Sequence, residues 1–312
     1  MKMSRSTISF TAFLGGILFL AAFYASGLYA NTPGATTGPW PAIGAAAVIV
    51  ANGFGLLFTS NRVSVKATVS VPFIYIALVA ANPWALHWSA FHPASLLMLG
   101  SIFCYLSFCA VRPSMEYLAG GTFLLGAAGL FVPPVLWIFP IFLLMGVGKA
   151  TAKVKYLVIS VIGLVLPLLI LAGITYLRQG ADAVLGLLPS LWERMTDVHL
   201  GIRHFSAATL ARILLTLVAT LMAVVHIVRQ LNTYKTVQFL ALVRLIMMAV
   251  ALSVMALLFP EDAHTPCGLI ICLPVTLLLN EYMAARGNER TKTALAIIAF
   301  LLLVAERVSL FL

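Results

Sequence analysis

Histidine and carboxylate side chains of this 312-residue chain gather in three short polar segments, 85–93, 178–206 and 261–265. Neutral histidine titrates at about pH 6.5, so it exchanges protons or binds a metal ion at modest cost. If the three segments meet in space, these groups could form a polar site for acid–base chemistry or metal binding. The candidate members of this polar site are His87, His92, Asp197, His199, His204 and Asp262.

The same segments have a plainer interpretation. Tryptophan and histidine are ordinary residues of the aromatic belt, where a membrane protein leaves the bilayer, and Trp84, Trp88 and Trp192 lie near the candidate groups. An anionic ligand would instead contact Arg194 or Arg203, because guanidinium groups suit oxyanions. The sequence leaves the polar site and the belt as alternatives.

The sequence lacks the familiar catalytic motifs. It contains no Walker A loop, no dinucleotide-binding fingerprint after a strand, no H-E-x-x-H motif and no nucleophile elbow. Its four cysteines form two C-x4-C pairs inside apolar runs, a spacing that matches neither a redox motif nor a zinc site. We therefore expect no cofactor and no bound metal, and a protein that is not an enzyme is favoured.

The composition predicts the solvent of this chain. Hydrophobic residues make up 62% of the sequence and charged residues 9%, whereas a soluble domain carries about 25% charged residues. The net charge is +10, but the basic residues lie singly between apolar runs, unlike the clustered basic face of a nucleic-acid-binding protein. The sequence thus predicts an all-α, polytopic transmembrane helix bundle that forms a single integral membrane domain, residues 1–312. We expect the lipid bilayer as partner, and no nucleic acid.

The apolar runs predict where the helices lie. Eleven candidates follow one another along the chain, at about 8–30, 41–59, 68–84, 94–111, 118–131, 135–148, 156–177, 207–228, 245–260, 266–284 and 293–310. With a cytoplasmic N-terminus, 14 of the 19 Lys and Arg residues fall in cytoplasmic segments, as the positive-inside rule requires. These features predict a multi-pass protein of the bacterial cytoplasmic (inner) membrane.

The stretch 118–148 is too long for one membrane crossing and too short for two full ones. Pro133 and Pro134 stand at its midpoint, where each removes a backbone donor and ends a helix. Basic residues before and after the stretch prefer the same side of the membrane. We therefore expect a hairpin of two short helices whose tip faces outward, with a glycine-rich first arm that permits close packing.

Two further segments have mixed polarity. The apolar residues of 178–206 fall close to helical spacing, which predicts an amphipathic periplasmic helix at the membrane interface. Thr233–Arg244 suggests a similar, shorter cytoplasmic element, with Arg244 able to extend its guanidinium to the surface. Inside the predicted helices, Asn52 is the best candidate for an interhelical hydrogen bond or a local unwinding. No ionisable group lies convincingly at mid-membrane, which disfavours a proton-driven pump.

The order of these features resembles a family of polytopic inner-membrane proteins of Gram-negative bacteria that has no assigned activity. The residues that carry the resemblance are Asn52, Asn61–Arg62, Phe91–Leu96, the run from Gly121 through Pro133–Pro134 to Pro140, and a later apolar helix with Gly163 and Pro167. The likeness spans most of the chain and consists mainly of apolar patterns.

Three functions are compatible with the sequence. The first is a transporter-like or assembly factor that handles a lipid-linked or amphiphilic substrate, because the short hairpin could line a cavity. The second is a membrane glycosyltransferase with a polyprenyl-phosphate sugar donor, although the segment 31–41 lacks the acidic residue expected in the first periplasmic loop of such an enzyme. The third is a structural subunit of a membrane complex, bound to a membrane-protein partner.

Overall fold

The computed structural model describes most of the chain as helix. The described residues are 39–62, 70–80, 83–110, 114–147, 153–197, 207–230, 234, 236–258, 268–285 and 289–308. Within these ranges there are eleven α-helices, two 3-10 helices and no strand. Ten of the α-helices coincide with predicted apolar runs and one with the predicted interfacial helix, so the all-α fold is confirmed. The predicted first helix, 8–30, lies outside the described residues.

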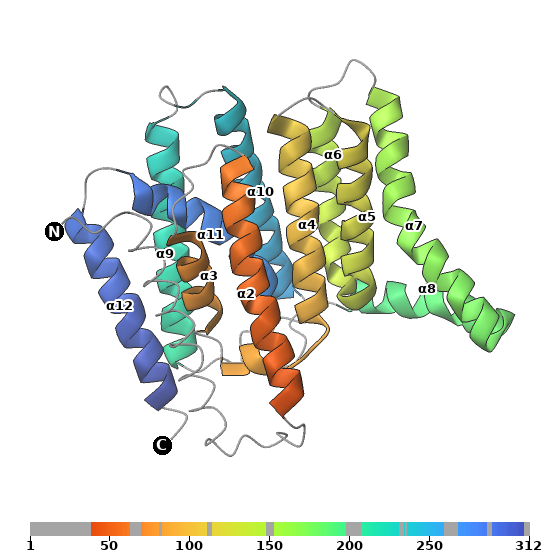
Figure 1. The fold of residues 1–312 in the computed structure, drawn as a ribbon, viewed down its shortest axis with the longest axis horizontal. Helices are drawn as coiled ribbons and strands as arrows, with labels where there is room; N and C mark the ends of the chain where they lie inside the picture. Colours follow the sequence, from red (N-terminus) through yellow and green to blue (C-terminus); the bar gives the residue numbers. More distant parts are fainter. Residues whose placement is uncertain are drawn as a thin grey trace.

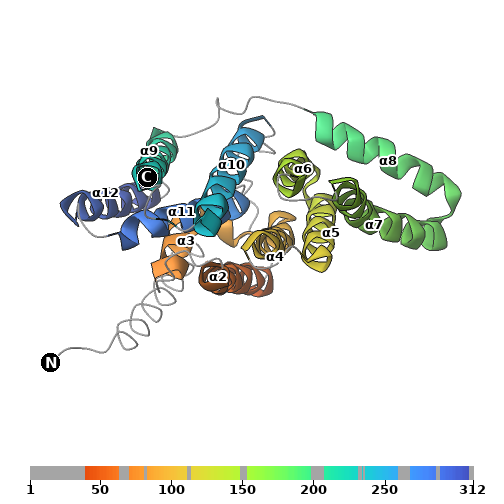
Figure 2. The ribbon, with the colours of Figure 1, turned by 90° about the horizontal axis from the view of Figure 1, so that it is seen from above.

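The helices follow one another in this order: α2 (Pro39–Arg62), α3 (Ser70–Ala80), η1 (Pro83–Leu86), α4 (Phe91–Ala110), α5 (Met115–Phe131), η2 (Pro133–Ile138), α6 (Phe139–Val147), α7 (Lys153–Gln179), α8 (Ala181–Thr196), α9 (Ala207–Arg229), α10 (Thr236–Leu258), α11 (Gly268–Ala284) and α12 (Glu289–Val308). Most of them run side by side along one direction, while α8 lies across one end of the bundle (Figures 1 and 2).

Helix α11 forms the centre of the bundle. It packs against α2, α3, α4, α9 and α10, and nearly every residue from Leu269 to Tyr282 is buried. The polar side chains of Asn280 and Glu281 on this apolar helix are buried, and such groups inside a membrane are expected to face neighbouring helices rather than lipid, which fits the central position of α11. The hairpin of α5 and α6, with α7 outside it, extends the bundle on the α4 side (Figure 2).

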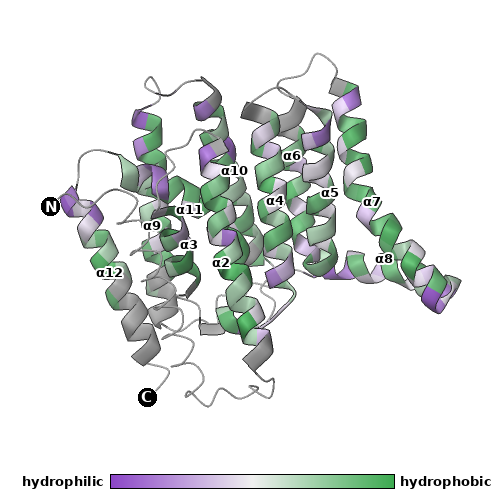
Figure 3. Ribbon diagram, in the orientation of Figure 1, coloured by the Kyte–Doolittle hydropathy of each residue, from purple (hydrophilic) through white to green (hydrophobic). Residues whose placement is uncertain are grey.

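Among the residues that the structure describes, four helices are long and apolar enough to cross a membrane: Pro41–Asn61, Phe91–Phe108, Val154–Gln179 and Gln238–Met255. Other apolar helices are shorter. At about 1.5 Å per residue, the 11 residues of α3 reach about 16 Å and the 9 residues of α6 about 14 Å. Apolar residues cover the middle of the bundle, whereas hydrophilic ones are found mainly towards the helix ends, those of α8 included (Figure 3).

The predicted helix 68–84 is shorter than expected. Helix α3 ends at Ala80, and a separate 3-10 helix begins at Pro83. Proline has no backbone N–H and disfavours the helical conformation of the residue before it. One apolar run therefore contains two separate helices, α3 and η1, and the hydropathy of the run does not show where the first helix ends.

The break at Pro133–Pro134 is confirmed. Helix α5 ends at Phe131, the two prolines open the 3-10 helix η2, and α6 returns beside α5 (Figure 1). Both prolines are buried. The exposed side chains at this turn are instead Phe131 and Trp137.

The separate cytoplasmic element predicted at Thr233–Arg244 is wrong. Residues from Thr236 onward belong to one continuous helix, α10, which ends at Leu258. Arg244 is buried rather than extended to the surface. The reason is that α10 packs against α4, α11 and η2, so neighbouring helices cover the position at which the apolar run is interrupted.

Helices α5 and α7 approach closely through two glycines. A Cβ atom at Gly126 would overlap the carbonyl oxygen of Leu164, and one at Gly163 would overlap Thr122. Small residues allow such backbone contact between helices in a membrane. The predicted glycine-mediated packing of the first hairpin arm thus has α7 as its partner.

Candidate functional site

The structure describes part of the predicted polar site. His87 and His92 flank the start of α4, and Arg194 and Asp197 lie at the C-terminal end of α8. The other members of the predicted set, His199, Arg203, His204 and Asp262, lie outside the described residues.

His92 is buried and holds a loop together. Its Nε2 lies 2.9 Å from the carbonyl oxygen of Ala85, which can only accept, so Nε2 carries the proton. Its Nδ1 accepts from the backbone N–H of Ser89 at 3.2 Å, and Trp88 stacks on the ring. Both ring nitrogens of His92 are therefore used within the segment 85–92, which leaves neither for a metal ion.

Arg194 and Asp197 are exposed, and the helix that carries them packs on different elements from those beside His87 and His92. Helix α8 packs on α7 and η2, whereas η1 packs on α2 and α3. Helix α8 and the 3-10 helix η1 nevertheless lie at the same end of the bundle (Figure 1). Asp197 ends α8, and its backbone N–H donates to the carbonyl oxygen of Glu193 at 2.9 Å.

A buried polar network surrounds Asn52. The Asn52 amide nitrogen donates to the Tyr75 hydroxyl at 3.1 Å and to the Ser95 hydroxyl at 2.8 Å. Tyr75 donates in turn to the carbonyl oxygen of Leu269, and Ser95 to that of His92. The network joins α2, α3, α4 and α11, and α2 runs through Asn52 as a continuous helix, without unwinding.

The hydrogen bonds of Tyr75 and Ser95 fix the orientation of the Asn52 amide. Each hydroxyl already gives its proton to a carbonyl oxygen, so each can only accept from Asn52. The amide nitrogen must therefore face them. The Asn52 Oδ1 atom, on the other side, is buried without a hydrogen-bond partner among the described residues.

A second polar network lies at the C-terminal end of α11, where three consecutive side chains contact different elements. The Asn280 Oδ1 atom accepts from Ser70 of α3 at 2.8 Å. The Glu281 carboxylate accepts from the Tyr234 hydroxyl at 3.0 Å. Tyr282 meets the His226 ring of α9 edge-on. This turn of α11 thereby connects α3, α9 and the segment between α9 and α10.

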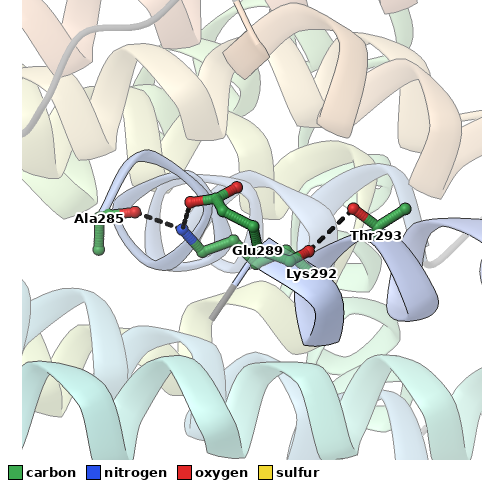
Figure 4. A network of polar contacts seen from close by, with 4 residues as sticks. All are labelled: Ala285, Glu289, Lys292 and Thr293. Carbon is green, nitrogen blue, oxygen red and sulfur yellow. Dashed lines mark hydrogen bonds and ion pairs between the residues drawn. The ribbon is translucent and has the colours of Figure 1, made fainter. Parts of the chain in front are cut away.

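Lys292 closes the same end of α11. Its Nζ donates to the carbonyl oxygen of Ala285, just beyond the helix, and to the Glu289 carboxylate at 3.2 Å (Figure 4). The Lys292 side chain is buried, and its charge lies 5.9 Å from the centre of the Tyr282 ring. A cation at a helix C-terminus satisfies the last carbonyl groups and the helix dipole, so Lys292 fastens α12 to α11.

Glu281 differs from the other acidic side chains whose burial is described. It is 1% exposed, whereas Glu116, Asp182, Glu193, Asp197 and Glu289 are exposed. Burial raises the pKa of Tyr234, and the nearby Glu281 carboxylate raises it further, so the Tyr234 hydroxyl keeps its proton and donates. Among the residues whose burial is described, the buried basic side chains are Arg244 and Lys292.

Metal binding finds no geometric support among the residues that the structure describes, since no three His, Cys, Asp or Glu side chains lie together there. The two networks contain residues that sequence reasoning missed. Tyr75, Ser95 and Tyr234 carry hydroxyl groups that are common in apolar helices and loops, and only a fold could single them out. Lys292 could be singled out from the sequence, because it is a basic residue at the start of an apolar run shortly after α11.

No protein-family model, curated protein or solved structure matches this chain.

Proposed function

We propose that this chain is a multi-pass protein of the bacterial cytoplasmic membrane that handles a lipid-linked or amphiphilic substrate at the outer interface. The observation that carries this proposal is α8, an amphipathic helix that lies across one end of the bundle beside the hairpin tip (Figure 1). Membership in the resembled family of polytopic inner-membrane proteins is part of the same proposal.

Helix α8 has the surface of an interfacial helix. Leu185, Leu188 and Trp192 follow one another at a spacing of three and four residues and are strongly exposed. At about 100° per residue, Asp182 and Glu193 fall on nearly the same side of the helix, next to this stripe, and form its polar face. An exposed apolar stripe beside a charged face suits the boundary between lipid headgroups and acyl chains.

Exposed aromatic side chains support the placement of this end at an interface. Trp88, Trp137, Tyr176 and Trp192 are exposed, and their segments all lie at the end of the bundle where α8 is found (Figure 1). Aromatic belts mark the level of the headgroups. The helix ends that carry Lys155 and Arg229 lie at the opposite end, as expected for a cytoplasmic face.

Helix α7 supports a route between the bilayer and α8. It packs on α5, α6 and α8 and exposes apolar side chains over most of its length, from Val154 to Leu177. The apolar surface of α7 ends at Leu177, and the exposed side chains of Arg178 and Gln179 separate it from the apolar stripe of α8. An apolar surface bordered by polar side chains suits an amphiphile better than a small soluble solute.

Site-specific photo-crosslinking tests the proposal. We would place benzoylphenylalanine at Leu188 of α8 and, as a matched control, at Leu221 of α9, which are 65% and 61% exposed. After irradiation of intact membranes, mass spectrometry identifies the lipids attached at each position. We expect polyprenyl-phosphate or glycan-bearing lipids to be enriched at Leu188 relative to Leu221, where bulk phospholipid should dominate.

Identical lipid profiles at the two positions would contradict the proposal. In that case α8 would be an ordinary interfacial helix, and the interpretation of the chain as a structural subunit would be preferred.

A further inference from the structure

Helix α8 is held to the molecule mainly at its two ends. None of its 16 residues is buried, and its neighbours are α7 and η2. Segments with few buried contacts and exposed hydrogen bonds open at low free-energy cost. The physical nature of the two end connections therefore decides whether α8 can move.

The N-terminal connection is a glycine joint. Gly180 has φ +87° and ψ −175°, a backbone region that is open essentially to glycine alone. A Cβ atom at this position would meet nothing within 4 Å. Glycine is thus required by the backbone conformation and not by packing, so no side chain braces the turn between α7 and α8.

At the C-terminal end of α8, an exposed hydrogen bond joins the helix to η2. The indole Nε1 of Trp137, in η2, donates to the carbonyl oxygen of Met195 at 3.1 Å. Met195 lies in the last turn of α8, where carbonyl groups have no partner within the helix. The Trp137 side chain is 50% exposed, so water can replace either partner when the bond breaks.

We propose that α8 is a hinged strap, which turns about Gly180 and is closed over the hairpin tip by the hydrogen bond from Trp137 to Met195. This inference rests on the proposed function, because opening would admit the amphiphile to the tip. Closing returns the C-terminal end of α8 to its position beside η2. The strap thereby regulates access to the surface that the proposed function assigns to α8.

Distance measurements between two spin labels test the strap. Labels replace the exposed residues Glu193 on α8 and Glu116 on α5, in a background without the four native cysteines. We expect two distance populations for the protein in lipid nanodiscs. Trp137→Phe keeps the apolar ring but removes the donor, and should raise the ratio of open to closed protein about fivefold, the value of one exposed hydrogen bond.

Glycine variants provide a matched pair. Gly180→Ala should shift the distances because alanine is strained at a positive φ. Gly186→Ala lies on α8, also with nothing within 4 Å, and should leave the distances unchanged. One distance population that is identical in wild type, Trp137→Phe and Gly180→Ala would overturn the strap. The proposed function fails on a different result, equal lipid profiles at Leu188 and Leu221, so the two ideas can be rejected separately.

Discussion

Asn52 connects three helices through hydroxyl groups whose protons are already given to backbone carbonyls. Tyr75 and Ser95 can therefore only accept, and the amide nitrogen of Asn52 carries the two protons needed to donate to both of them. The interaction is specific in chemistry as well as in position. In a membrane, an interhelical hydrogen bond of this kind contributes about 0.6 kcal/mol on average and up to about 1.7 kcal/mol.

Substitution of Asn52 tests the contribution of this network. Asn52→Ala removes two hydrogen bonds and should lower the free energy of unfolding by about 1–3 kcal/mol. Asn61→Ala is the matched control, since Asn61 is an exposed asparagine on the same helix, and should change it by less than about 0.5 kcal/mol. Equilibrium unfolding in detergent micelles measures both. Equal losses would mean that the network does not stabilise the fold.

Residue-level prediction from the sequence depended on whether a side chain was rare in its surroundings. Asn52 and Pro133 stand out because amides and adjacent prolines are uncommon in apolar helices. His92 did not reveal its role, since a histidine beside tryptophan fits both an interfacial site and a loop anchor. The distinction depends on the carbonyl of Ala85 and the amide of Ser89, whose positions a sequence does not contain.

The contact between α5 and α7 depends on the absence of a side chain at glycine. Gly163 faces Thr122 and Ala119 of α5 so closely that any side chain would force the helices apart. Gly173 lies further along α7, and a Cβ atom at this position would meet nothing within 4 Å. Two glycines of the same helix therefore have opposite physical roles.

Alanine at these two glycines should have opposite effects. Gly163→Ala must separate α5 from α7 and should cost about 1–3 kcal/mol of stability. Gly173→Ala should be neutral or should stabilise by up to about 1 kcal/mol, because alanine favours the helix. Thermal unfolding of the two purified variants in one detergent gives the comparison. A Gly163→Ala variant as stable as Gly173→Ala would show that the close approach is not required.

At the scale of elements, periodicity and proline positions predicted most of the helices, including the break before η2. These two sequence signals failed where a side chain is surrounded by neighbouring helices instead of lipid or water. The predicted helix 245–260 begins earlier in the structure, as α10, and includes Arg244, which is buried in a helix that packs on α4 and α11. Hydropathy assigns a charged residue to the membrane surface, and it cannot see that a neighbouring helix provides a buried environment.

At the scale of the molecule, the exposed tryptophans of the described residues lie at the end of the bundle that carries α8, and the helix ends with Lys155 and Arg229 lie at the other. This division predicts the topology, which cysteine labelling can test. In a cysteine-free background, a cysteine at Glu193 should react with an impermeant thiol reagent added to intact spheroplasts. Cysteines at Lys155 and Arg290, in the first turns of α7 and α12, should react only after the membrane is opened. Labelling of position 290 from outside would invert the proposed orientation.

The long-range hydrogen bonds of α11 also bear on how the chain is made. Ser70 and Asn280 are 210 residues apart in sequence, and Tyr75 and Leu269 are 194 residues apart. At about 5–20 residues per second, the ribosome needs about 10–40 s to supply these partners after α3 has emerged. During that time the Tyr75 hydroxyl lacks the carbonyl to which it donates, and the central position among α2, α3 and α4 has no helix in it. The species most exposed to quality-control proteases is therefore the unfinished chain, in which the first helices have entered the membrane before the one that fills their centre.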